Sequence, residues 1–365
     1  MARGVITAVD VEPLAFPLSP PFRAAVRLID RVCVALVRVR DDAGREGCGT
    51  AFAFGDDDLR PIVAVARALG AGRVGADAAA PERNAREMMA ALALAGAGGP
   101  AIAALSAIDL ALWDLLGQRA GLPLWRLLGA ARDSVPTYGS GGSLALPTDA
   151  LAAEMAGFVA AGHRAVKLKV GHGIAGDRTR IAAVREAVGA DVRIAADGNQ
   201  QWTPKGAIRW AQAMADLDLW WLEEPVRADD LAGHAEVRAG TPIDIASGET
   251  LFGASDAARC ITTRAVDVVM PNLQRIGGIS AWRKVAAAAE LAGVPVAAHV
   301  YPEVQLHLMC AQPNGLVLEW WPGWPWLWQE SIAIADGRAR PPEQPGLGFT
   351  LDTDRVAAHR MERRR

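Results

Sequence analysis

Three acidic residues in the middle of the chain are evenly spaced, each directly after a short apolar segment. These residues are Asp197, Glu223 and Glu249, and successive acids lie 26 residues apart. A strand followed by a helix and its loops occupies about this length. The spacing therefore predicts that the three carboxylates lie at equivalent ends of successive parallel strands.

Three carboxylates at neighbouring strand ends repel one another unless a cation lies among them. Mg²⁺ suits such a site because it prefers oxygen ligands and keeps coordination positions open for the oxygens of a substrate. Zinc fits less well because no cluster of cysteines or histidines accompanies the acids. The alternative is that each acid pairs with a separate lysine or arginine, which is the default for a single buried acid. The regular spacing favours Mg²⁺ held by Asp197, Glu223 and Glu249.

Two lysines precede the acids in a short apolar stretch, Val166–Val170, that is typical of a strand. Residues i and i+2 of a strand face the same way, so Lys167 and Lys169 are expected to point together. Such a pair is usually a solvated edge, because charged residues are rarely buried unpaired. Beside a metal, however, the pair indicates removal of the proton next to a carboxylate. The product is an enediolate whose negative charge Mg²⁺ stabilises.

Each basic residue then has an expected role. Lys169 is the candidate base, and burial, Lys167 and the metal are each expected to lower its pKa toward neutrality. Lys167 is expected to hold the carboxylate of the substrate, and His299 is placed to approach from the opposite face.

From about residue 134, candidate strands alternate with amphipathic stretches of helix length. Eight parallel strands with seven or eight helical returns close naturally into a barrel, whose chemistry lies at the C-terminal ends of the strands. The residues that fall there are Lys169, Asp197, Glu223, Glu249, His299 and Glu319. The predicted strands are Val135–Tyr138, Ala165–Val170, Val192–Asp197, Leu219–Glu223, Ile243–Ser247, Val266–Met270, Val294–Ala298 and Leu316–Glu319.

The first 130 residues have a different pattern, in which strands are followed by helices in an α+β arrangement. The predicted strands are residues 4–16, 31–40 and 46–54, and the alanine-rich helical region is 59–129. Between the first two strands, Pro17–Asp30 contains Arg23 and Arg27. We interpret this segment either as an exposed connection or as a mobile lid whose arginines meet an anionic ligand.

The end of the chain is rich in tryptophan. Packing of these rings against the first domain is favoured over a ligand box, and the basic residues 359–365 are predicted to be a solvated tail. The tryptophans are Trp320, Trp321, Trp324, Trp326 and Trp328.

Composition limits the class of protein. The chain is 51% hydrophobic and 22% charged, which fits a soluble globular protein. A net charge of −3 provides no field for nucleic acid, so no such partner is expected. The four cysteines are scattered and are predicted to be core thiols of a reducing compartment. No signal-peptide pattern is present, and Asp109 and Asp114 interrupt the best membrane-span candidate, so we expect a cytoplasmic protein that does not enter a membrane.

Several motifs together resemble one family over nearly the whole chain. These motifs are Ala107–Asp114, Lys167-x-Lys169, Asp197–Gln200, Glu223–Pro225, Gly248-Glu249, Ile276–Ile279, His299 and Glu319. With them the chain resembles the enolase superfamily, in the mandelate racemase subgroup (the mandelate racemase/muconate lactonizing enzyme family).

The resemblance implies a fold and a set of roles. The fold is a modified (β/α)7β barrel over residues 131–324, capped by an α+β domain of residues 1–130 that about 325–365 completes. By resemblance, the three acids are the metal ligands, Lys169 and His299 are the two acid/base residues, and Glu319 is an acid that hydrogen-bonds the substrate carboxylate. Pro17–Asp30 and a second loop near Ala53–Gly55 would close the site and set specificity. Relatives are commonly symmetric assemblies, so a homo-oligomer is expected.

One residue departs from the family pattern. The subgroup usually has an aspartate where this chain has Asn272, and that aspartate orients the histidine and favours its charged form. Asn272 supplies no negative charge, although it is expected to accept a hydrogen bond from the ring of His299. The change weakens a mechanism that needs Lys169 and His299 as equally competent bases.

Three functions remain open from the sequence. The leading hypothesis is a Mg²⁺-dependent dehydratase that converts a sugar acid into a 2-keto-3-deoxy acid, because this activity is common in the subgroup that the chain resembles. The second is racemisation or epimerisation of a 2-hydroxy acid by the same proton abstraction. The third is an impaired relative that binds a carboxylate or a protein partner without turnover. The fold does not decide the substrate.

Overall fold

A three-stranded antiparallel sheet forms the first part of the molecule. The computed structural model describes residues 4–25, 27–94 and 96–361, so residues 362–365 of the predicted basic tail lie outside the description. The sheet has the order β1-β2-β3. Its strands are β1 (Ile6–Arg23), β2 (Leu28–Asp41) and β3 (Glu46–Ala53).

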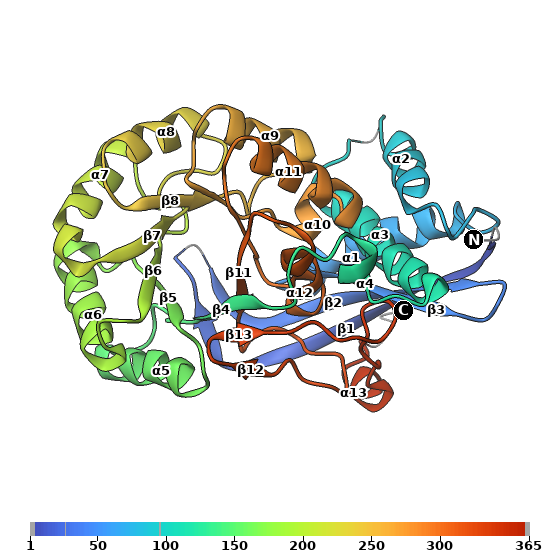
Figure 1. Ribbon diagram of the computed structural model, residues 1–365, viewed down its shortest axis with the longest axis horizontal. Helices are drawn as coiled ribbons and strands as arrows, with labels where there is room; N and C mark the ends of the chain where they lie inside the picture. Colours follow the sequence, from blue (N-terminus) through green and yellow to red (C-terminus); the bar gives the residue numbers. More distant parts are fainter. Residues whose placement is uncertain (1–3, 26, 95, 362–365) are drawn as a thin grey trace.

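The first two strands run well past their predicted limits. Pro17–Asp30 is therefore largely a continuation of the β1–β2 hairpin, with an irregular register between Pro17 and Phe22, and the prediction of a connecting loop was wrong except at the tip. The prolines that suggested a break lie in β1, which is an edge strand, and edge strands are where a sheet tolerates proline. The tip of this hairpin reaches over the mouth of the barrel (Figure 1).

The predicted helical region is confirmed. Two glycines of β3 allow a close approach to the third helix: a Cβ on Gly47 would lie 2.1 Å from the carbonyl oxygen of Ala111, and one on Gly49 2.1 Å from that of Ala107. The helices are α1 (Asp56–Ala71), α2 (Pro81–Ala91), α3 (Pro100–Ala120) and α4 (Leu124–Leu127).

Helix α3 joins the first part of the chain to the barrel. Among the described residues it alone is long and apolar enough to cross a membrane by length and composition, so the expectation that its aspartates disqualify it was wrong. In the folded protein, however, 83% of that stretch is buried. Asp109 accepts hydrogen bonds from the backbone N–H and the hydroxyl of Ser280, and Asp114 accepts them from the N–H groups of Cys48 and Leu347. The helix is therefore a core element whose two acids link distant segments.

Eight parallel strands form a closed barrel, because β11 pairs with β4 as well as with β10. All eight predicted strands are present, with limits moved by at most two residues. The fold predicted from the sequence is confirmed. The strands are β4 (Val135–Ser140), β5 (Ala165–Lys169), β6 (Arg193–Asp197), β7 (Leu219–Glu223), β8 (Asp244–Ser247), β9 (Val268–Val269), β10 (Val296–Ala297) and β11 (Gly315–Trp320).

Helices surround the barrel strands on the outside (Figure 1). Each strand-to-strand connection contains a helix, including the last one, residues 299–314. These elements are α5 (Thr148–Ala160), α6 (Gly173–Val188), α7 (Pro204–Ala213), the short 3₁₀ turn η1 (Ala215–Leu217), α8 (Leu231–Ala239), α9 (Gly253–Thr262), α10 (Leu273–Ile276), α11 (Ile279–Leu291) and α12 (Pro302–Ala311).

Apolar side chains fill the barrel beneath the strand ends. Small residues such as Ala165, Ala195 and Ala246 pack with Tyr138 and Trp221, whose rings meet edge to face at 5.5 Å between centroids. The barrel is therefore a packed core rather than a pore, which is typical of this architecture. Its C-terminal end is the place where polar side chains gather.

The end of the chain returns to the first sheet. The strands β12 (Ile334–Ala335) and β13 (Arg338–Ala339) extend the barrel sheet beside β4, and α13 (Thr353–Ala358) follows. His359 accepts a hydrogen bond at its carbonyl from the N–H of Ala15 and stacks on Phe16 at 4.2 Å. These contacts support our proposal that about 325–365 completes a capping domain of residues 1–130. All four cysteines are buried and free, as predicted.

Candidate active site

Strand register places the key side chains next to one another. In the parallel pairing of β5, β6 and β7, Lys169 is the partner of Asp197, and Asp197 is the partner of Glu223. Lys167 lies two residues before Lys169 on the same strand and therefore faces the same way. Glu249 follows β8 by two residues. The spacing read from the sequence thus brings these residues to one end of the barrel.

The three acids form one cluster. A carboxylate oxygen of Asp197, one of Glu223 and one of Glu249 all lie within 4.8 Å of one another. Burial, reinforced by the charges of the other two acids and opposed by Lys167, raises the pKa of Glu223 well above its ordinary value. Three carboxylate oxygens at this separation suit a hard divalent cation.

One oxygen of the cluster lacks a full hydrogen bond. The Nε2 atom of His299 lies 2.9 Å from Oε2 of Glu249, which is an ion-pair distance. Apart from this contact, the buried oxygen has no hydrogen-bond partner among the described residues. An incompletely satisfied carboxylate oxygen at the centre of an acidic cluster is what a cation site offers.

Lys167 is buried among the acids. Its Nζ lies 2.6 Å from Oε1 of Glu223, 3.0 Å from Oε1 of Glu319 and 3.9 Å from Oδ2 of Asp197, and its side chain is 2% exposed. Burial alone would lower its pKa, but Glu223 and Glu319 outweigh burial and hold the pKa well above the usual range. Lys167 is thus a buried ammonium that compensates several carboxylates.

Lys169 is the more accessible of the two lysines, with 14% of its side chain exposed. It donates a hydrogen bond to Oδ2 of Asp197. Burial and Lys167 do lower its pKa, as expected from the sequence, but the combined attraction of Asp197, Glu249 and Glu223, with Asp197 the largest of the three, raises the pKa instead. The expected lowering therefore requires the charge of Asp197 to be neutralised by another cation.

Glu319 is held in its charged form. Its Oε2 accepts a hydrogen bond of 2.7 Å from the N–H of Val300, and its Oε1 faces Lys167. Burial opposes the charge, yet Lys167 and the hydrogen bonds lower the pKa of Glu319 to about 2. Glu319 is therefore a carboxylate at neutral pH, and the expected hydrogen bond to a substrate carboxylate first requires a proton on Glu319.

Asn272 meets the ring of His299 with its amide nitrogen. The Oδ1 atom of Asn272 caps helix α10 by accepting from the N–H groups of Gln274 and Arg275. The amide nitrogen therefore faces His299 Nδ1, at 2.7 Å. We expected Asn272 to accept a hydrogen bond from the ring, but the helix cap occupies its oxygen and reverses the direction. His299 then accepts at Nδ1 and carries its hydrogen on Nε2.

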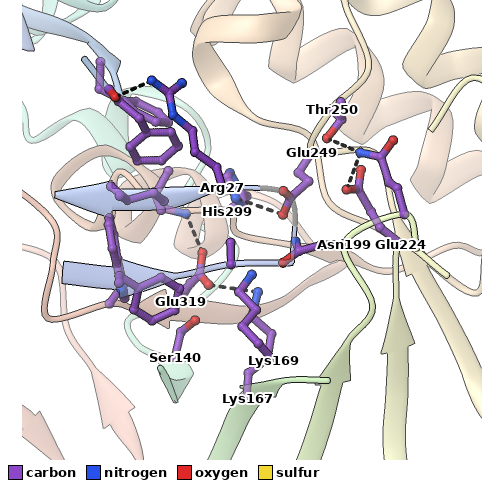
Figure 2. A pocket seen from close by; sticks show the side chains of 18 of the residues that line it. Arg27, Ser140, Lys167, Lys169, Asn199, Glu224, Glu249, Thr250, His299 and Glu319 are labelled. Atoms are coloured by element: carbon purple, nitrogen blue, oxygen red, sulfur yellow. Dashed lines mark hydrogen bonds and ion pairs between the residues drawn. The ribbon is translucent and has the colours of Figure 1, made fainter. Parts of the chain in front are cut away.

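A cavity of about 290 Å³ lies at the C-terminal end of the barrel and is lined by Lys167, Lys169, Glu249, His299 and Glu319, whereas Asp197, Glu223 and Asn272 lie behind its wall. Figure 2 shows Lys167 and Lys169 entering on one side, with Glu319, His299 and Glu249 across from them. Sequence reasoning assigned no role to several polar residues that also line it, namely Ser140, Asn199, Gln200, Glu224, Thr250 and Arg275. Ser140 could have been found, because it ends the first barrel strand.

Backbone strain marks the loops after β6 and β7. The backbone φ angles of Asn199, Gln200 and Glu224 are 43°, 65° and 38°. Residues other than glycine rarely adopt positive φ angles. Buried oxygens of Asn199 and Glu224 have no hydrogen-bond partner. Strained backbone and unsatisfied polar atoms beside a cavity are typical of a functional site.

The two arginines of Pro17–Asp30 differ in position. Arg23 is exposed and is absent from the cavity wall, whereas Arg27 lines it. Arg27 donates to Oδ2 of Asp58 at 2.8 Å and to the carbonyl of Phe54 at 2.7 Å. Its charge is therefore already paired.

In the tryptophan-rich segment, one ring packs against the first domain and another lines the cavity. Trp324 packs on Phe52 of the first domain at 5.3 Å and donates to the buried Glu303. Trp321, by contrast, lines the cavity.

The sequence matches two family models. Residues 150–355 match the one described as "Enolase C-terminal domain-like", and residues 6–129 match "Mandelate racemase / muconate lactonizing enzyme, N-terminal domain". The chain belongs to the mandelate racemase/muconate lactonizing enzyme family of the enolase superfamily.

Named relatives span nearly the whole chain. The L-talarate/galactarate dehydratase of Salmonella typhimurium is 36% identical over 93% of this chain and 86% of that protein. A crystal structure of that enzyme, liganded with Mg and L-lyxarohydroxamate, has a TM-score of 0.95 and covers 99% of this chain and 94% of that one at 34% identity. The 3,6-anhydro-alpha-L-galactonate cycloisomerase of Streptomyces coelicolor is 36% identical over 88% of this chain and 89% of that protein. An enolase from Bradyrhizobium, complexed with magnesium and mandelic acid, has a TM-score of 0.92 and 33% identity, and covers 99% of this chain and 100% of that one.

The buried ammonium of Lys167 generates the first prediction. Lys167→Met leaves Glu223 and Glu319 without their shared cation, so the free energy of unfolding at pH 7.5, measured in urea with EDTA, should fall by about 3–5 kcal/mol. The acids left behind will have raised pKa values, and their cost is absent below the pKa of the unfolded chain and grows as the pH rises. The loss should therefore be smaller at pH 5 than at pH 7.5.

The matched control is Lys284→Met. Lys284 pairs with Glu82 on the surface, where the two side chains are 61% and 43% exposed. Its loss should change the free energy of unfolding by no more than about 0.5 kcal/mol. Equal effects of the two substitutions would contradict a compensating role for Lys167.

Proposed function

We propose that this protein is a Mg²⁺-dependent lyase that dehydrates a sugar acid to a 2-keto-3-deoxy acid. The observation that carries the proposal is the contact of Lys169 with Asp197 beside a cluster of three carboxylates, next to a cavity that Lys169 and Glu249 line. A base next to a cation site is the combination that removes a weakly acidic proton beside a carboxylate.

Mg²⁺ would be held by Asp197, Glu223 and Glu249. Their oxygens are close enough to share one ion, and the incompletely bonded oxygen of Glu249 supports the assignment. When bound, Mg²⁺ supplies stabilisation of the negative charge that develops on the enediolate. Relatives crystallised with magnesium support the choice of metal.

Lys167 and Lys169 would divide the work on the substrate. Lys167 is a fixed buried ammonium, so it attracts the carboxylate of the substrate and keeps it in place. Lys169 takes the proton from the carbon next to that carboxylate. Once Asp197 is engaged as a ligand, burial and Lys167 are left to lower the pKa of Lys169 and make the neutral amine available.

The geometry at His299 favours dehydration over racemisation. Racemisation needs a proton acceptor on each face of the reacting carbon, but Asn272 leaves His299 as a hydrogen-bond donor through Nε2. We therefore assign the proton transfers to Lys169. It removes the proton at C2, the C3–O bond breaks, and the ammonium of Lys169 returns the proton so that the hydroxyl leaves as water. His299 orients the substrate by donating a hydrogen bond from the other side.

Two other functions would use parts of the same site. A racemase or epimerase of a 2-hydroxy acid would use the same first step and remains the second candidate, but the Asn272–His299 contact speaks against it. An impaired protein that only binds a carboxylate would not need to keep both lysines, three clustered acids and Glu319 around one cavity. The four free, buried cysteines support a reducing, cytoplasmic compartment. From the family we further propose a homo-oligomer without nucleic-acid or membrane partners.

The proposed activity is tested by a screen of mono- and dicarboxylic sugar acids with Mg²⁺, in which formation of a 2-keto acid is followed. We expect at least one acid to react, and the rate to fall by about 10²–10⁴-fold in Lys169→Ala, because a positioned base contributes that much. Lys205→Ala, an exposed lysine on α7, is the matched control and should keep the activity. Full activity in Lys169→Ala would reject Lys169 as the base.

The Asn272 contact generates a separate prediction. In D₂O, the protein should exchange the C2 hydrogen of only one of two C2 epimers, as followed by proton NMR. Asn272→Asp can still cap α10 with one oxygen and accept from the ring with the other, so Nε2 becomes a proton acceptor. Exchange of the opposite epimer should then rise, by up to about 100-fold. Comparable exchange of both epimers by the unmodified protein would contradict the single-base assignment.

A further inference from the structure

We propose that the part of the cavity wall built by the capping sheet and Trp321 is a subsite for an apolar group, so that the acid that is dehydrated carries one carboxylate, hydroxyls at C2 and C3, and a hydrocarbon group in place of the polar far end of an ordinary sugar acid. The inference rests on the proposed function, because it takes Lys167 and the acidic cluster as the place where the carboxylate of the substrate binds. It narrows the class of acid among the many that the family accepts.

Four aromatic rings from three separate segments make up this wall. Phe22 comes from the end of β1, Phe52 lies near the end of β3 with Phe54 directly after that strand, and Trp321 follows β11. The rings are in edge contact, with centroids 5.8 Å apart for Phe22 and Trp321, 6.5 Å for Phe54 and Trp321, and 5.3 Å for Phe52 and Phe54. Ala24 and Ile29 extend the apolar surface. Such a surface favours a hydrocarbon group over hydroxyls.

Among the described residues of this wall, Arg27 is the one cation, and its charge is already paired. Arg27 donates one nitrogen to Asp58 and another to the carbonyl of Phe54. Figure 2 shows its guanidinium turned away from Lys167 and Lys169. Among the residues that the structure describes, the wall offers no other cation to pair with a second carboxylate.

Arg275, the remaining arginine of the cavity, serves the opposite region. It donates to the carbonyl of Glu249 and to the hydroxyl of Thr250, beside the acidic cluster. A dicarboxylic acid with one end at Lys167 and the other against the rings would therefore bury an unpaired charge, which is costly.

One residue of the aromatic wall, Phe52, is anchored through its backbone. Gln274 accepts from the N–H of Phe52 at 2.7 Å and donates to its carbonyl at 3.1 Å, and the hydroxyl of Tyr301 donates to Gln274. The backbone of Phe52 is thus fixed to α10, the helix that Asn272 caps. A preformed apolar surface loses little conformational entropy when its ligand binds.

The first experiment compares unreactive acids of known shape. Titration calorimetry of the full chain with MgCl₂ should show hexanoate binding more tightly than butanoate, by about fourfold for each of the two additional methylene groups. Adipate has the same number of carbons as hexanoate but a second carboxylate, and it should bind more weakly than hexanoate. Adipate binding as tightly as hexanoate, or no binding of hexanoate, would overturn the proposal.

Substitution at the wall tests the residues themselves. Trp321→Gln should remove most of the advantage of hexanoate over butanoate. The matched control is Trp326→Gln, since Trp326 packs against Trp320 and Phe349 and does not line the cavity. Phe22→Gln provides a second variant from another segment, and circular dichroism checks that each variant is folded. An unchanged hexanoate preference in the folded Trp321 and Phe22 variants would contradict the assignment.

Turnover separates this inference from the proposed function. 2,3-Dihydroxy acids ending in an alkyl or phenyl group are compared with hexonates and hexarates in the 2-keto acid assay. Faster dehydration of the hexarates would overturn the apolar subsite while leaving the dehydratase intact. Tight binding of hexanoate with no dehydration of any acid would leave the subsite intact and overturn the proposed reaction.

Discussion

The structure depends on the concentration of negative charge that the barrel buries at its open end. Asp197, Glu223 and Glu319 are almost fully buried within reach of one ammonium group, that of Lys167. Acids this close cannot all ionise in an apolar interior without cations. The lysines provide part of that compensation, and their positions and pKa values follow from it. A divalent ion among the same acids would release Lys169 from Asp197. The same ion would therefore both compensate the negative charge and activate the base.

Most of this arrangement could be predicted from the sequence, because in parallel strands the spacing of residues along the chain determines which side chains lie at the same end of the barrel. Equal intervals between Asp197, Glu223 and Glu249 were enough to place the acids at one end of the barrel, and alternation along β5 placed both lysines on the same face. The fold, its eight strands and the clustering of these residues could therefore be predicted. These properties depend on periodicity and register, which a single sequence records directly.

Other features could not be predicted because they depend on which donors and acceptors the fold brings together to compete for the same hydrogen bond. The oxygen of Asn272 caps α10, so only its nitrogen is left for His299. The sequence alone does not indicate which of the two amide atoms faces the ring. Arg27 likewise suggests an anion-binding lid until its bonds to Asp58 and Phe54 are known. The prolines of Pro17–Asp30 suggested a loop because their place on an edge strand is a property of the sheet. The aromatic wall is assembled from three distant segments and is visible only in the folded chain.

Binding of Mg²⁺ by the acidic cluster can be measured directly. Titration calorimetry of the metal-free protein with MgCl₂ should show a single ion per chain for the unmodified protein and no binding for Asp197→Asn. Asp216→Asn, which removes an exposed acid paired with Arg178, should bind as the unmodified protein does. Unchanged Mg²⁺ binding by a folded Asp197→Asn protein, or no binding by the unmodified chain, would contradict the assignment of the cluster and the chemistry built on it.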